Sequence, residues 1–392
     1  MSFYEESSIV ITPNAYKAGT LYAVSPTSGL ADMDFTRATA ATRVDEDGLV
    51  ADVLSGVPRI DYTGGGCPHI LAEPQRTNTI LYSEEFGSTG WSFVTAGSVI
   101  APIVTNDYAI SPDGTQNAQR IQFNLNGGTV SADRTVIRQG VGSQTDWFFS
   151  VWMKSTNGSN QKILWHTTSD SNETTITSEW QRFTLNLNAT SDYWIGLGLR
   201  GGTSTVDTAD ILVYGFQAEQ GSYPTSYIPT SGATVTRNQD QFTRDGISSL
   251  INSTEGVLFV EMAALSDDLT YKMISLSDGS TTNRISVIFN NTSSNTIRVV
   301  IVNYSVSFDE TYTVTSILDF NKIAVKYKEN DFALWINGTE VAIDTSGAVP
   351  INLNKLSFDI GNGTYHFYGK VRQLQVYPTA LSDSELTILT TP

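Results

Sequence analysis

Histidine and cysteine are scarce in this 392-residue chain, and their positions limit the chemistry that it could perform. None of His69, His166 and His366 is paired with another at metal-ligand spacing, and Cys67 is the only cysteine. The chain contains no Gly-X-Ser-X-Gly, His-Glu-X-X-His or phosphate-loop motif. The sequence therefore predicts no catalytic residue and no metal-binding residue of these kinds, and it excludes an internal disulfide.

Carboxylates could act in glycoside hydrolysis, which needs two of them facing each other across the scissile bond. The nearest approximations are Asp45-Glu46-Asp47 and Glu84-Glu85, which lie in a loop-rich segment and at a strand start. Glu219 lies just past the apolar run ILVYGF, in the segment QAEQGSYPTSYIPT (217–230), whose prolines and tyrosines could pack an extended chain. We interpret Glu219 as a structural hydrogen-bond or ion-pair residue, and we expect that the protein is not an enzyme.

Aromatic side chains could bind sugars, because their rings stack on the apolar faces of pyranoses. Trp194 alternates with Tyr193 and Ile195, so one of the two rings is expected to leave the core. Trp335 is out of phase with Leu334 and Ile336, and it is expected to point outward near a hairpin. Trp165, which follows a polar turn, completes the three glycan-binding candidates, although packing inside or between domains is the alternative role for each.

The net charge of −17 argues against several classes of partner. Such a surface repels phosphate backbones, so nucleic acid is not expected as a partner. No apolar run is long enough to cross a membrane, and basic amphipathic stretches are missing. The N-terminus MSFYEESS carries two glutamates where a signal peptide needs positive charge, which predicts synthesis in a cytoplasm.

Short runs of β-branched and aromatic residues indicate an all-β protein. In RFTLNL, Phe183, Leu185 and Leu187 share one face of a strand, and polar residues occupy the other. Asn337-Gly338 between two apolar runs predicts a type I′ hairpin, and Ser382 with Glu385 predicts a capping box that opens one short helix. We expect an extended N-terminal arm (1–78) without a core of its own, followed by two antiparallel β-sandwich domains in tandem (79–238 and 239–392).

Three parts of the chain resemble known families. LYSEEFGSTGW, WFFSVWMKS, EWQRFTLNL and QAEQGSYPTSYIPT resemble the carbohydrate-binding jelly rolls found on glycanases and in bacteriophage structural proteins. NKIAVKYKENDFALWINGTEVA and FYGKVRQLQVYPTALSDSEL resemble a laminin-G/concanavalin A-like sandwich, which is lectin-like. The segment from FTRATAATRVDEDGLV to ILAEPQRTNTILYSEEF resembles the leader that precedes such modules in phage virion proteins.

These resemblances imply a non-enzymatic virion protein: a tail fibre, tail appendage, head fibre or capsid decoration that adheres to host cell-surface glycans. The arm would bind other virion proteins, and a homo-oligomer, with a trimer favoured, would cover exposed strand edges.

The catalytic strand pattern of concanavalin-like glucanases, Glu-X-Asp-X-X-Glu, is absent. No cofactor is expected, although related jelly rolls carry a structural calcium, which here would involve Glu84 or Glu85 with Asp210. The alternatives are an accessory carbohydrate-binding protein of a glycan-degrading enzyme, or a structural spacer without a ligand.

Overall fold

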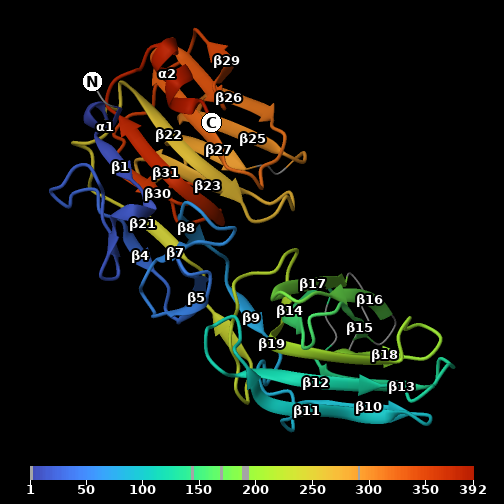
Figure 1. The fold of residues 1–392 in the computed structure, drawn as a ribbon. Coiled ribbons are helices and arrows are strands. Elements are labelled where there is room, and N and C mark those ends of the chain that lie inside the picture. Colours follow the sequence, from blue (N-terminus) through green and yellow to red (C-terminus); the bar gives the residue numbers. More distant parts are fainter. Residues whose placement is uncertain (1–2, 143–144, 168–170, 188–193, 290–291) are drawn as a thin grey trace. The chain divides into compact units, whose positions relative to one another are not determined.

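The computed structural model describes residues 3–142, 145–167, 171–187, 194–289 and 292–392, and almost all of its regular structure is β-sheet (Figure 1). The chain forms two compact units. The central unit contains residues 49–52 and 75–237, and the C-terminal unit contains residues 1–48, 53–74 and 238–392. Each unit has its own hydrophobic core between two antiparallel sheets, which confirms the predicted all-β class with jelly-roll and lectin-like sandwiches.

The central unit contains two five-stranded sheets. The first, which we call the Arg sheet, follows the order β10 (Ser92–Ala96), β13 (Arg134–Gly140), β18 (Trp194–Arg200), β15 (Gln161–Thr167) and β16 (Ser171–Ile176). The second follows the order β11 (Ile100–Ala109), β12 (Ala118–Asn124), β19 (Thr208–Gln220), β14 (Trp147–Ser155) and β17 (Gln181–Leu187). A two-stranded ladder pairs β9 (Arg76–Asn78) with β20 (Val235–Arg237).

Alternation along the strands produces the core of the central unit. Phe183, Leu185 and Leu187 face the apolar interior, as the sequence pattern predicts, whereas Thr184 and Asn186 are exposed. The segment after β19 also packs on this unit, because Tyr223, Tyr227 and Ile228 are buried.

The C-terminal unit pairs an eight-stranded sheet with a seven-stranded sheet. The larger sheet runs β29 (Thr339–Asp344), β28 (Phe332–Ile336), β27 (Asn321–Lys328), β22 (Glu255–Ala264), β31 (Gly369–Tyr377), β8 (His69–Ala72) and β7 (Arg59–Asp61), with β1 (Ile9–Ile11) also on β31. The smaller sheet runs β26 (Ser305–Thr313), β25 (Thr296–Asn303), β24 (Asn283–Phe289), β23 (Lys272–Ser277), β30 (Lys355–Ser357), β21 (Gln241–Arg244) and β4 (Asp34–Thr36).

Short elements complete the C-terminal unit. The N-terminal segment adds α1 (Phe3–Glu6), the 3-10 turn η1 (Pro13–Ala15), β2 (Tyr16–Lys17), β3 (Thr20–Leu21) and β5 (Ala41–Val44). The next strand, β6 (Val50–Val53), has its first three residues in the central unit. Helix α2 (Asp383–Thr390) covers the outer face of the larger sheet, where its Leu386 and Leu389 pack with Phe259 and Tyr377. The capping box is confirmed, because the Ser382 amide donates to the Glu385 carboxylate at 2.7 Å.

The N-terminal arm differs from the prediction. Residues expected to form an extended arm supply β1, β4, β7 and β8 to the sheets of the C-terminal unit, and Figure 1 shows blue β1 beside red β31. Ile9, Ile11, Ile60 and Ile70 lie in the core of that unit. These strands are too short to form a core alone, but they bury their apolar residues by extending sheets whose edges would otherwise be open.

Candidate functional site

Two of the three tryptophans predicted as glycan-binding candidates are buried, which corrects that prediction. Trp165 is 1% exposed and lies in the core of the central unit, edge-on to Phe216 at a ring distance of 5.8 Å. Trp335 is 6% exposed and packs beneath α2 with Leu386 and Leu389. The predicted phase of Trp335 is correct, because its ring leaves the main core. The face that it enters, however, is covered by the helix instead of water.

Trp194 is the one candidate that keeps exposed surface. Its side chain is half-buried on the Arg sheet, and the guanidinium carbon of Arg138 lies 4.3 Å from the centre of its ring. That contact is within the range of a cation–π interaction, so one face of the indole is occupied by a charged group. Tyr193, the alternating partner in the prediction, lies outside the described residues.

Glu219 has the structural role that its position predicts. Its side chain is fully buried at the end of β19, where it accepts hydrogen bonds from the amide and hydroxyl of Thr225 at 2.8 and 2.6 Å. The side-chain amide of Gln217 also donates to it at 2.7 Å, and Arg76 lies 3.8 Å away. These bonds fasten the segment after β19 to the strand that precedes it.

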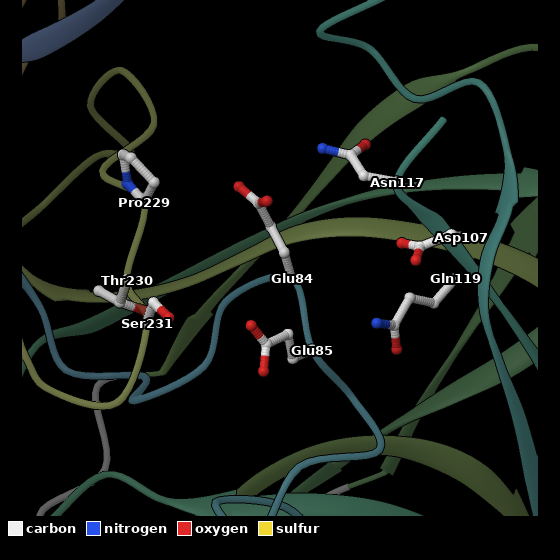
Figure 2. Close-up of a pocket in the computed structure, with 8 residues that line it drawn as sticks. All are labelled: Glu84, Glu85, Asp107, Asn117, Gln119, Pro229, Thr230 and Ser231. Carbon is white, nitrogen blue, oxygen red and sulfur yellow. The ribbon is translucent and has the colours of Figure 1, made fainter. Parts of the chain in front are cut away.

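The central unit contains an open cavity of about 380 Å³, which we call the Glu84 cavity (Figure 2). Figure 2 shows the Glu84 carboxylate pointing between Pro229 and Asn117, with Asp107 on one side and Thr230 on the other. Three parts of the chain build the wall: the segment before β10, strands β11 and β12 with the turn between them, and the segment after β19. Its lining residues are Glu84, Glu85, Asp107, Asn117, Gln119, Pro229, Thr230 and Ser231.

A hydrogen-bond network beneath the cavity fixes Glu84. The buried Tyr227 hydroxyl lies 2.8 Å from the Glu84 carboxylate and 2.6 Å from the hydroxyl of Ser83. Nearby, Asp113 accepts hydrogen bonds from the Tyr214 hydroxyl at 3.1 Å and from the Asn117 side chain at 2.8 Å. Burial raises the pKa of both tyrosines, so they stay protonated and can donate.

The cavity wall is anchored in the same way. Gln119 accepts a hydrogen bond from the amide of Phe86 at 2.8 Å, and the Thr230 amide donates to the Ser83 hydroxyl at 2.8 Å. Because their side chains or backbone atoms are held, these wall residues present polar groups in fixed positions.

The pKa of Glu84 is raised above its ordinary value. Burial is the main cause, and the nearby carboxylates of Asp113 and Asp52 add to it; the hydrogen bond from Tyr227 opposes the shift without cancelling it. Glu84 is therefore neutral over a wider pH range than an ordinary glutamate. A carboxyl group that keeps its proton can donate a hydrogen bond to a ligand, or a proton to a leaving group.

The lining determines what the cavity can bind. Its amides, hydroxyls and carboxyl groups offer donors and acceptors that match the hydroxyls of a sugar. No described residue of the lining is aromatic, so binding would rest on hydrogen bonds. Of these residues, the sequence singled out only Glu84 and Glu85; Asp107, Asn117, Gln119, Thr230 and Ser231 belong to no motif, and only the topology brings them together.

The residues do not fit the calcium site that the resemblance implies. Asp210 is on β19 and lines a different cavity from Glu84 and Glu85. Its carboxylate is held by the Arg120 guanidinium at 2.8 and 2.5 Å, so a cation there would compete with an ion pair already made. Across the described ranges, no group of three or more histidine, cysteine or acidic side chains is placed to hold a metal.

The other titratable groups noted in the sequence lie apart from one another. His69 is buried 3.3 Å from Asp61, and His366 lies 3.4 Å from the side chains of both Gln239 and Gln241. Cys67 is exposed. Neither helix of the described chain is long and apolar enough to cross a membrane.

Comparisons with known proteins agree with the C-terminal sandwich. Residues 258–387 match the family model described as the concanavalin A-like lectin/glucanases superfamily. No curated protein matches the chain.

Several solved structures match this chain at low similarity. The CBM40 module of the Ruminococcus gnavus IT-sialidase, bound to α2,3-sialyllactose, is 18% identical with a TM-score of 0.32, covering 37% of this chain and 86% of that one. Domain 4 of a Geobacillus stearothermophilus GH43 arabinanase, in complex with arabinotriose, is 14% identical with a TM-score of 0.34, covering 44% and 83%. Domains LG4-5 of the mouse laminin α1 chain are 10% identical with a TM-score of 0.25, covering 74% and 93%. At such TM-scores, the assignment of fold rests on the sheets of this chain and on the family match at residues 258–387.

Proposed function

We propose that this protein binds glycans without cleaving them, and that the Glu84 cavity is one of its binding sites. The observation that carries the proposal is the convergence of fixed amide, hydroxyl and carboxyl groups on one open cavity. Sugars are recognised through such groups because each hydroxyl both donates and accepts a hydrogen bond. The lectin-like family match of the C-terminal unit supports the same class of ligand.

Glycoside hydrolysis is the second candidate, and the raised pKa of Glu84 favours it. A general acid in such enzymes keeps its proton near neutral pH, and Asp107 would be the second carboxylate in the same cavity. We favour binding because Glu84 has a structural reason for its raised pKa: it is partly buried and hydrogen-bonded to Tyr227 in a network that supports the cavity wall.

We further propose that the protein is a component of a phage virion, where it adheres to host-surface glycans as a homo-oligomer, with a trimer favoured. The support is the combined resemblance of the N-terminal segment and both sandwiches to modules of virion proteins. Because strands of the N-terminal segment form part of the sheets of the C-terminal unit, the segment would attach to other virion proteins through its exposed surface. An accessory carbohydrate-binding protein of a glycan-degrading enzyme, or a spacer without a ligand, is the alternative.

A glycan array with the intact protein tests the binding. Substituting both Asp107→Asn and Glu85→Gln should weaken the binding of neutral glycans, whereas Glu329→Gln, an exposed acid of the C-terminal unit, should have no effect. Trp194→Ala reports separately on the tryptophan candidate. A reducing-end release assay on every bound glycan should stay negative, and release that Glu84→Gln abolishes would establish hydrolysis instead.

The proposal that this protein is part of a phage virion needs its own test. Negative-stain images of virions labelled with an antibody against this chain should show label at the tail or on the head. An unlabelled virion, together with binding in the array, would favour the accessory module. Failure to bind any glycan in any oligomeric form would favour the spacer.

A further inference from the structure

The outer face of the Arg sheet carries an unusual group of side chains. Ile137, Trp165, Ile195 and Leu197 of this sheet point into the core of the central unit. Because side chains alternate along a strand, the residues next to them point to the opposite face. On that outer face lie the half-buried Arg134 and Arg138 from β13, the half-buried Trp194 and Arg200 from β18, and the buried His166 from β15.

Strand register brings these groups together. Arg134 is paired directly with Arg200, and Arg138 is paired with Gly196, which is paired in turn with His166. A Cβ atom on Gly196 would lie 2.1 Å from the carbonyl oxygen of Ile137 and 2.7 Å from the Cβ of Arg138. With glycine at that position, no side chain stands between the arginine and the histidine.

The cationic groups of this face have no anionic partner among the residues that the structure describes. No carboxylate of the described residues forms an ion pair with Arg134, Arg138 or Arg200; the Arg200 Nε instead donates to the carbonyl of Ser131 at 2.8 Å. The Nε atoms of Arg134 and Arg138 are buried without a hydrogen-bond partner. His166 is 4% exposed, and its Nδ1 is also buried without a partner.

Two acidic residues on or beside these strands, within the part of the chain that the structure describes, make contacts elsewhere. Asp133 accepts a hydrogen bond from the amide of Val130 at 3.0 Å. Glu173 is held by Lys162 at 3.0 Å and by the amide of Thr205 at 2.7 Å. Neither carboxylate forms an ion pair with the three arginines.

Gathering like charges without partners has a cost, and the titration behaviour of the face reflects it. Burial and the charge of Arg134 lower the pKa of Arg138. Burial lowers the pKa of His166 to about 4, and the charges of Arg138, Arg134 and Arg200 contribute. An oxyanion bound to the guanidinium groups of this face would relieve the repulsion between them. The guanidinium carbon of Arg138 lies 4.3 Å from the centre of the Trp194 ring. Because this contact already restricts the Arg138 side chain, the side chain would lose less conformational entropy on binding a ligand.

We propose that the outer face of the Arg sheet is a binding site for the oxyanion groups, carboxylate or sulfate, of an acidic polysaccharide. The planar guanidinium groups of Arg134, Arg138 and Arg200 match the geometry of such groups. The overall charge of −17 opposes indiscriminate binding of polyanions, so attraction is confined to this face. This site goes beyond the proposed function, because it lies on a different sheet from the strands of the Glu84 cavity and takes a different class of group.

Three polymers with the same backbone test the site. Surface plasmon resonance would compare dextran, carboxymethyl-dextran and dextran sulfate with the full-length protein at about 0.15 M salt. We expect no binding of dextran through this face and measurable binding of one or both acidic polymers. Which one binds identifies the oxyanion as carboxylate or sulfate.

Substitutions locate the binding. Arg138→Gln and Arg134→Gln should each weaken it by about tenfold or more, because each removes charge-assisted hydrogen bonds. Arg138→Lys should recover only part of the loss, since a lysine lacks the planar fork. Lys154→Gln, which makes the same charge change on the other sheet of this unit, should leave the affinity unchanged.

The unmodified protein offers a second readout that does not depend on a variant folding. With three histidines in the chain, NMR of the imidazole protons should resolve one signal for each. Inorganic sulfate should shift the His166 signal and raise its pKa, while His69 and His366, both in the C-terminal unit, should be unaffected.

The proposal is wrong if neither acidic polymer binds, or if Arg138→Gln and Lys154→Gln weaken binding equally. A sulfate titration that leaves His166 unchanged would also overturn it. These outcomes are separate from the test of the Glu84 cavity, which uses neutral glycans and other substitutions.

Discussion

Arg59 and Asp240 form an ion pair in which neither side chain is exposed, although 181 residues separate them along the chain. Asp240 also pairs with Arg37 at 2.9 Å, and Arg59 pairs with Glu73 at 2.6 Å. Burial alone would lower the pKa of Arg59, but the two carboxylates raise it, so its guanidinium stays charged. This cluster joins the N-terminal segment to the strand that follows residue 238, inside the C-terminal unit.

Replacing Asp240 should strongly destabilise that unit. Asp240→Asn keeps the shape but removes the carboxylate shared by two buried arginines, which should cost about 3–5 kcal/mol of unfolding free energy. The matched control is Asp309→Asn: Asp309 pairs with Arg298 at 2.7 and 2.5 Å, but both side chains are about one-third exposed, and its loss should cost at most about 1 kcal/mol. Urea unfolding measures both, and equal costs would contradict the role assigned to burial.

The N-terminal segment should be required for the C-terminal unit to fold. A fragment of residues 239–392 lacks β1, β7 and β8 and leaves Asp240 without its arginines. We expect it to bind a hydrophobic dye and to show no cooperative thermal transition. The fragment 75–237 keeps β9, whose Asn78 donates to the carbonyls of Phe216 and Ile228, and should melt cooperatively. A cooperative transition of the first fragment would show that the N-terminal strands are dispensable.

Local signals in the sequence predicted part of this architecture well. The alternation in RFTLNL, the capping box at Ser382 and the turn at Asn337-Gly338 each depend on neighbouring residues, and the structure confirms all three. The N-terminal strands contain only two to four residues, so they show no alternation that could reveal their partners. Trp335 was wrongly predicted to be exposed, because the alternation along a strand shows on which face of the sheet a side chain lies but not what covers that face.

The candidate sites were harder to predict because they are assembled by topology. The Glu84 cavity takes residues from three separate parts of the chain. On the Arg sheet, Arg138, Gly196 and His166 come from three different strands, and none belongs to a motif. A charge that is isolated in sequence becomes part of a cluster only when the register of the strands is known.

The turn at Asn337-Gly338 should be sensitive to side-chain type. Both residues have positive φ, 50° and 82°, as a type I′ turn requires. Gly338→Val places a β-branched residue there, and its Cβ would lie 3.2 Å from the Thr391 hydroxyl, so we expect a loss of about 1–3 kcal/mol. Gly338→Asn is the control, because asparagine tolerates this conformation and should cost less. Chemical denaturation measures both, and equal losses would indicate that side-chain bulk, not backbone conformation, decides the effect.

Glu84→Gln should stabilise the central unit at neutral and alkaline pH. The folded-state pKa of Glu84 lies above its ordinary value, so the unfolded state releases the proton more readily. Below the ordinary pKa the carboxyl is neutral in both states, and the substitution gains nothing; as pH rises through the folded-state pKa, the charged form destabilises the native protein. Glutamine removes that cost and still accepts a hydrogen bond from Tyr227.

The melting temperature of the Glu84→Gln variant should therefore rise at pH 8 relative to the unmodified protein, and the gain should fade toward pH 4. The neighbouring Glu85→Gln, at an exposed position, is the control. A gain of the same size at both pH values would mean that the substitution acts through packing instead of charge.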